Sequence, residues 1–117
     1  MKAVALLPSE VGAFCPLAAT TTAMERGITS QAMLVAPGLR VTRCEFAAGQ
    51  ELSEHASPAR LLLQVIGGRC AFSFGGQTCQ LGPGDLLHLP PRVPHALRAI
   101  TDLTVLLIQA SDSAPTK

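Results

Sequence analysis

Short apolar runs, separated by glycine, proline or aspartate, follow one another along the chain from Gly38 onward. The runs are LRVTRCEF, LLLQVI, RCAFSF, TCQL, DLLHL, HALRAI and LTVLLI. Runs of this kind, with frequent turn signals between them and no long segment of helical periodicity, are typical of an antiparallel β sandwich or barrel. The hydrophobic pattern therefore predicts an all-β fold.

The segment RCAFSFGGQTCQL gives the clearest local prediction. Gly75 and Gly76 suit a two-residue hairpin turn that needs positive φ, so we expect Phe74 to pair with Gln77. Cys70 and Cys79 then become diagonal neighbours about 7–8 Å apart, and we interpret them as packing residues rather than as a disulfide. Strand alternation puts the following residues on the core face: Cys70, Phe72, Phe74, Cys79 and Leu81.

The first third of the chain is weakly patterned. A short helical turn around Ala18–Arg26 or an extended edge arm would fit it. We expect residues 1–32 to form an N-terminal arm or edge strand that packs on the barrel or on a dimer partner. Residues 33–110 are expected to form the barrel, and residues 111–117 a flexible tail.

Composition narrows the classes of function. The 117 residues are 48% hydrophobic and 15% charged, which fits one globular domain with a substantial core. The net charge of +1, without a basic run and with no tryptophan or tyrosine, gives no surface for nucleic acid. No apolar run is long enough for a membrane helix or a signal peptide, so we expect a cytoplasmic protein without a membrane partner. The four cysteines form no CxxC pair and are expected to be reduced thiols.

Two segments carry candidate chemistry. In LGPGDLLHLPPRVPHAL, Pro83 and Gly84 predict a tight turn whose backbone amides Asp85 can bind. The prolines that follow stiffen the next connection and so fix His95 at the start of a strand. His55 also lies between a turn and an apolar strand. The two histidines are therefore candidate residues of one site.

These segments resemble the two sequence motifs of the cupin family. The first motif is glycine, five residues, histidine, one residue, histidine, three or four residues, glutamate, six residues and glycine. Its matching positions are Gly49, His55 and Gly68. The second motif is matched by Pro83, Gly84, Asp85, Pro90, Pro94 and His95. The resemblance covers residues 33–109. It implies an antiparallel double-stranded β-helix, the cupin or jelly-roll barrel, with both histidines inside, and a homodimer formed through the N-terminal strands.

The chain departs from the metal-binding pattern of that family. Ser57 stands at the position of the second histidine, and Leu61 stands at that of the glutamate, with Arg60 beside it. A catalytic metal needs about three protein ligands and an open position, and neither serine nor leucine replaces an imidazole or a carboxylate. The sequence therefore predicts an incomplete metal site and assigns no cofactor.

A divalent transition metal (Zn, Mn, Fe or Ni) bound by His55 and His95 stays open as an alternative. His88 would be the third metal ligand if its face of the strand DLLHL lines the barrel. A position on the outer face, or at a subunit contact, is the other interpretation of His88.

Three functions fit these residues, and the sequence does not decide whether the protein is an enzyme. The first, which we take as the prediction, is binding of a small polar ligand by His55 and His95, with Ser57 and Arg60 as further ligand-binding residues. The second is an enzyme, either metal-dependent (a dioxygenase, isomerase or decarboxylase) or metal-free with a histidine base. Metal-free cupin epimerases pair histidine with a tyrosine, which this chain lacks. The third is a barrel retained for assembly, with the segment AMLVAPG as a dimer contact.

Overall fold

The computed structural model describes residues 5–17 and 28–111, which form nine β-strands and no helix. The prediction of an all-β fold is confirmed, and the helical turn considered for Ala18–Arg26 lies outside the described residues. None of the described residues belongs to a helix that could cross a membrane. The strands are β1 (Ile28–Ala36), β2 (Leu39–Phe46), β3 (Glu51–His55), β4 (Arg60–Gly67), β5 (Cys70–Phe74), β6 (Gln77–Leu81), β7 (Leu86–Leu89), β8 (His95–Ala99) and β9 (Leu103–Ala110).

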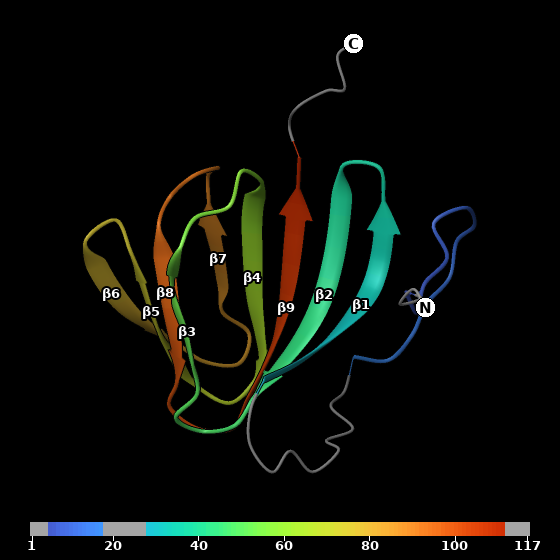
Figure 1. Ribbon diagram of the computed structural model, residues 1–117. Helices are drawn as coiled ribbons and strands as arrows, with labels where there is room; N and C mark the ends of the chain where they lie inside the picture. The colour runs from blue at the N-terminus through green and yellow to red at the C-terminus, as the bar shows by residue number, and fades with distance from the viewer. Residues whose placement is uncertain (1–4, 18–27, 112–117) are drawn as a thin grey trace.

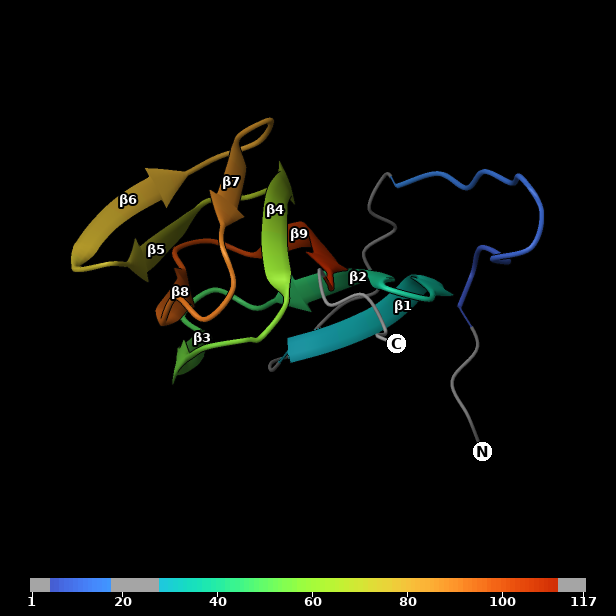
Figure 2. The ribbon, with the colours of Figure 1, turned by 90° about the horizontal axis from the view of Figure 1, so that it is seen from above.

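The strands form two antiparallel sheets (Figure 1). One sheet has the order β1-β2-β9-β4-β7, and the other has the order β3-β8-β5-β6. Seen from above, β6, β5, β8 and β3 lie on one side of the molecule, away from β1 and β2 (Figure 2). Every apolar run predicted from the sequence matches one of these strands, and only Arg69, Asp85 and Ile100 at the ends of three runs lie just outside them. The strand β3 was not predicted. An arm or edge strand was expected within residues 1–32, and β1 begins the first sheet at Ile28 and continues to Ala36.

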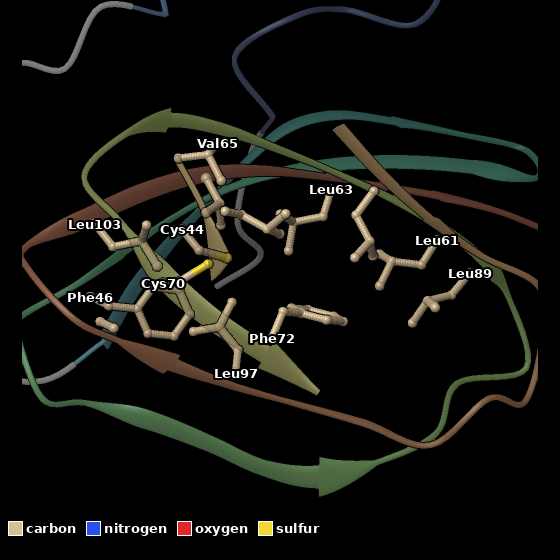
Figure 3. Packing of buried hydrophobic residues seen from close by; sticks show 14 residues of the cluster. Cys44, Phe46, Leu61, Leu63, Val65, Cys70, Phe72, Leu89, Leu97 and Leu103 are labelled. Carbon is tan, nitrogen blue, oxygen red and sulfur yellow. The ribbon is translucent and has the colours of Figure 1, made fainter. Parts of the chain in front are cut away.

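Alternate residues of the two sheets meet between them and form the core (Figure 3). Phe46 and Leu63 come from the five-stranded sheet, and Phe72 and Cys70 from the other; all four are almost inaccessible to solvent. Burial of each large apolar side chain stabilises the fold by roughly 1.5–3 kcal/mol. The buried cluster comprises Cys44, Phe46, Leu61, Leu63, Val65, Cys70, Phe72, Leu81, Leu87, Leu89, Leu97, Ala99, Leu103 and Val105.

The β5–β6 hairpin has the predicted turn. Phe74 pairs with Gln77, and Gly75 and Gly76 adopt φ values of 56° and 80°. The register puts Cys70 opposite Leu81 rather than opposite Cys79, and both cysteines are free thiols. The hairpin therefore contributes apolar side chains to the core as the alternation required.

Two glycines of the sequence motifs lie in tight connections between strands. Gly84 has a φ of 90° in the turn before β7, where Gly82 N–H donates to Asp85 Oδ2 at 2.8 Å, as the sequence predicted. Gly68 follows β4 with a φ of 86°, and a Cβ atom there would collide with the carbonyl oxygen of Asp102. Glycine is required at position 68 both by the backbone conformation and by this close approach.

The outer face of β2 carries a buried ion pair. Arg43 Nη2 lies 2.8 Å from Glu45 Oε2, and the two side chains are 13% and 9% exposed. Arg43 stands opposite Leu106 in the β2–β9 register, and Glu45 stands opposite Thr104. Arg43 Nε is buried and has no hydrogen-bond partner in the described part of the chain. Glu45 therefore supplies the main compensation for this buried cation.

Candidate ligand-binding site

Pairing of β3 with β8 brings His55 and His95 together. The two residues are directly opposite in the register, and their ring centroids lie 4.5 Å apart with an angle of 58° between the ring planes. Cross-strand neighbours on one face of a sheet are close enough for their side chains to act together. The sequence-predicted convergence of the two imidazoles is thus present in the fold.

Each imidazole is oriented by the backbone of its own segment. His55 Nδ1 lies 2.9 Å from the carbonyl oxygen of Ser53, and His95 Nδ1 lies 2.9 Å from that of Val93. A carbonyl oxygen only accepts hydrogen bonds, so each Nδ1 carries the hydrogen and donates it. In the neutral ring, Nε2 is then a hydrogen-bond acceptor, and neither Nε2 has a partner among the described residues.

The two rings line a cavity between the sheets with a volume of about 60 Å³. Since a cavity needs only about 10–15 Å³ to hold one water, this space can take a group of several non-hydrogen atoms. His95 is 8% exposed, and its ring stacks on Phe72 with centroids 5.7 Å apart. The wall is mostly apolar and consists of Phe46, Leu52, His55, Ser57, Leu61, Leu63, Phe72, His95, Leu97, Val105, Leu107 and Gln109.

Ser57 links the two segments that supply the histidines. Its hydroxyl oxygen accepts a hydrogen bond from Ala59 N–H at 3.1 Å, and its carbonyl oxygen accepts one from Arg92 N–H at 2.7 Å. Arg92 lies in the proline-rich connection before His95 and has a φ of 70°, a conformation that costs a residue with a side chain about 1–2 kcal/mol. Ser57 lines the cavity.

Arg60 and His88 are placed elsewhere. Arg60 Nη1 donates a hydrogen bond to His88 Nε2 at 2.9 Å, and both side chains lie outside the cavity. The reason is the alternation of β7, in which Leu87 and Leu89 are buried and therefore direct His88 to the opposite face. The structure does not bring the third predicted imidazole to the other two, nor does it place the Arg60 guanidinium at the cavity.

The donor set does not fit a metal site of the family pattern. Leu61, at the position of the family's glutamate, is 5% exposed and forms part of the apolar wall. Within residues 5–17 and 28–111, no three histidine, cysteine, aspartate or glutamate side chains cluster so as to hold a metal ion. Two imidazoles without a carboxylate leave a divalent cation short of ligands and of compensating charge.

Gln109 is a cavity residue that the sequence did not indicate. It stands opposite Leu61 in the β4–β9 register and lies on the same face of β9 as Val105 and Leu107, which also line the cavity. The amide makes no hydrogen bond to any residue that the structure describes. Strand alternation could have revealed it. Gln109 is the next alternate residue after Val105 and Leu107, so it faces the same side of the strand as they do.

The core cysteines are not candidate nucleophiles. Burial raises the pKa of the Cys44 thiol to about 11, and burial together with the neighbouring Cys79 raises the pKa of Cys70 to about 11. Because the thiolate is the reactive form, both thiols stay inert at neutral pH. The chemistry available to the cavity is therefore that of the two imidazoles, the Ser57 hydroxyl and the Gln109 amide.

A two-sheet β-barrel with paired histidines at its motif positions defines a small cupin-type protein. Residues 42–109 match the sequence profile of the cupin domain. The match covers more than half of the chain, and the protein belongs to the cupin family. A sequence search among curated proteins gives no match.

Two solved structures share this architecture over nearly the whole chain. A cupin superfamily protein, DSY2733 from Desulfitobacterium hafniense, is 27% identical, with coverage of 92% of this chain and 96% of that one and a TM-score of 0.79. A conserved protein of unknown function from Streptococcus pyogenes, SPY1581, is 21% identical, with coverage of 97% and 98% and a TM-score of 0.80, and so supports the fold alone.

One similar structure belongs to an enzyme. A variant of salicylate 1,2-dioxygenase from Pseudoaminobacter salicylatoxidans is 25% identical over 72% of this chain, with a TM-score of 0.68. The match covers 26% of the dioxygenase chain. It therefore concerns one part of that larger enzyme.

Proposed function

We propose that this protein is a small-molecule-binding cupin whose ligand is held inside the barrel by His55 and His95. The observation that carries the proposal is the pair of imidazoles, with ring centroids 4.5 Å apart. Both Nδ1 atoms bond to backbone carbonyls, and neither Nε2 atom has a partner among the residues that the structure describes. Two preoriented acceptors on neighbouring rings that line a mostly apolar cavity can form a site for a polar group on an otherwise apolar molecule.

Ligand binding by these residues needs no metal ion. The apolar wall supplies affinity through burial, and the imidazoles supply orientation through hydrogen bonds. Leu61 adds to this apolar wall at the point where the family pattern has a carboxylate. The site is therefore better suited to an organic molecule than to a divalent cation.

A metal-dependent enzyme is the second candidate, and the likeness to salicylate 1,2-dioxygenase favours it. In that case, His55 and His95 would supply two of the metal ligands. The remaining ligands would have to come from elsewhere, because no three potential ligands cluster among the described residues. The two candidates differ in what the purified protein contains.

The test compares the contents of three proteins purified without a metal-affinity tag: the natural chain, His95→Ala and His88→Ala. We expect metal analysis to give far less than one transition metal per chain. Native mass spectrometry should show a bound organic molecule in the natural chain and in His88→Ala, and its loss in His95→Ala. His88 is the matched control because its imidazole lies outside the cavity. A near-stoichiometric metal that disappears in His95→Ala would instead support the metal-dependent enzyme.

A further inference from the structure

We infer that the ligand of this cavity is an uncharged molecule that bears a hydroxyl group, and that Gln109 is a determinant of its recognition. This inference rests on the proposed function and specifies the chemical class of the ligand. Three properties of the cavity support it: the charge of its wall, the hydrogen-bonding groups of the wall that have no partner among the described residues, and the cavity volume.

The described residues of the cavity wall carry no fixed charge. No lysine, arginine, aspartate or glutamate is among the residues of 5–17 and 28–111 that line it. A charge moved from water into such surroundings is costly unless an opposite charge compensates it. A buried ammonium group would find no carboxylate, and a buried carboxylate would find no lysine or arginine. The wall therefore favours a ligand whose polar group is neutral.

The free hydrogen-bonding groups of the wall call for a group that both donates and accepts. The Nε2 atoms of His55 and His95 are acceptors and need a donor. The Gln109 amide and the Ser57 hydroxyl can each donate to an oxygen atom. A ketone or an ether could only accept and would leave both imidazoles unsatisfied. A hydroxyl group donates one hydrogen bond, to one of the two Nε2 atoms, and accepts two, so it suits both kinds of partner.

The position of Gln109 explains why it would contribute to recognition. Gln109 belongs to β9 in the five-stranded sheet, whereas the histidines belong to the four-stranded sheet. The cavity between the sheets therefore has polar groups from both walls, with leucine and phenylalanine side chains between them. A volume of about 60 Å³ has room for a group of several non-hydrogen atoms, so the hydroxyl-bearing end of a larger molecule can enter it.

Four probes of similar shape test the inference: phenol, toluene, benzoate and benzylammonium. Each is titrated into isotopically labelled protein at about pH 7.5, where phenol is neutral and the last two are charged. Chemical-shift changes at His95 report binding in the cavity, and the titration gives the dissociation constant. We expect phenol to bind about fivefold or more tighter than toluene, and about tenfold tighter than either ion.

The variant Gln109→Leu tests the recognition residue. We expect its affinity for phenol to fall about fivefold, while its affinity for toluene stays the same or rises. Gln64→Leu is the matched control. It replaces the same side chain in the same way on β4, where Gln64 does not line the cavity. Equal losses for phenol and toluene in Gln109→Leu would contradict a recognition role and indicate a change of shape.

The outcomes separate failure of the inference from failure of the proposed function. If benzoate or benzylammonium binds most tightly with shift changes at His95, the cavity binds small molecules but of a charged class, and the inference is wrong. If none of the four probes affects His95 in the folded protein, both the inference and the proposed function are wrong. Tightest binding by phenol, with the loss in Gln109→Leu, supports both.

Discussion

His55 and His95 make the same local hydrogen bond from opposite positions of the β3–β8 pair, each from Nδ1 to the carbonyl oxygen two residues earlier. Two unrelated segments of the chain thus orient their imidazoles in the same way. The result is a pair of Nε2 acceptors whose tautomers are fixed by the backbone rather than by a bound group.

The first prediction concerns these tautomers. In the ligand-free protein, we expect both rings in their neutral form to carry the hydrogen on Nδ1, which donates to a backbone carbonyl. Long-range ¹H–¹⁵N correlation spectra of the imidazole rings measure this directly. His88 should also carry its hydrogen on Nδ1, because its Nε2 accepts from Arg60. An Nε2–H form of His55 or His95 would contradict the hydrogen bonds to Ser53 and Val93.

The second prediction concerns the glycine that follows β4. Gly68→Ala should lower the free energy of unfolding by about 2 kcal/mol or more, because the positive φ disfavours a side chain and the new Cβ would meet Asp102. Gly75→Ala is the comparison: its φ is also positive, but no atom lies within 4 Å of the added Cβ. Its cost should stay near 1 kcal/mol. Urea denaturation of both variants measures the difference, and equal costs would mean that the close approach to Asp102 is unimportant.

The third prediction concerns the ion pair on the outer face of β2. Glu45→Ala leaves Arg43 buried without its carboxylate and should destabilise the fold by about 3 kcal/mol. Replacement of both residues, Arg43→Met with Glu45→Leu, should restore most of this loss. The exposed Glu51→Ala serves as control, with an expected change within about 0.5 kcal/mol. A double variant as unstable as Glu45→Ala would show that the pair itself, not the unpaired charge, determines stability.

The fourth prediction follows from the core thiols. Their pKa rises from 9.0 to about 11 in the folded protein, so folding favours the neutral form of Cys44 and Cys70. The contribution of these thiols to the free energy of unfolding is fully present below pH 9, and it is lost as the pH rises from 9 through about 11. It amounts to roughly 2–3 kcal/mol per thiol.

This alkaline loss is easy to attribute, since the chain has no tyrosine and its two lysines are Lys2 and Lys117. Denaturation curves between pH 8 and 11 give the free energy of unfolding at each pH. This free energy should depend less on pH in the double variant Cys44→Ala/Cys70→Ala than in the natural chain. Identical pH dependence in both proteins would contradict the assignment to these thiols.

The fifth prediction concerns assembly. The N-terminal segment exposes large apolar side chains: Phe14 is 95% exposed, Val11 65% and Leu6 50%. Leu6 and Leu7 N–H donate to the carbonyl oxygens of Ala32 and Met33, which ties the segment to β1. We expect a homodimer in which these side chains are covered by the second copy. Sedimentation equilibrium should give twice the chain mass, and Phe14→Ser should shift the protein toward the monomer; a monomeric natural chain would contradict this.

Strands with apolar runs could be predicted from the sequence, including the edge strands β6 and β7, whereas the polar edge strand β3 could not. β9 lies between two strands of its sheet and is buried along its first half, so it appears as a continuous apolar run. β3 is an edge strand of five residues, four of them exposed, and the polar segment ELSEH has no alternation to recognise. A pattern of hydrophobicity reports burial, and β3 has little of it.

The candidate site could be predicted only in part, because turn residues fix some positions whereas strand parity leaves others open. Ser57, His55 and His95 lie next to turn residues at fixed spacing, and all three line the cavity. His88 alternates with leucines on both sides, and sequence parity does not say which face is inside. Gln109 follows directly after an apolar run, and only the length of β9 shows that it continues the inward face.

The strands that hold the two histidines differ in how firmly they are anchored. β8 is paired on both sides, with β3 and β5, whereas β3 is paired with β8 alone and has a register shift before His55. Local opening is least costly where a strand has one neighbour and little buried surface. β3 can therefore detach from β8 while the rest of the barrel stays folded. Fraying of this edge would give a molecule from solvent a route to the interior, with His95 left in place as the fixed half of the site.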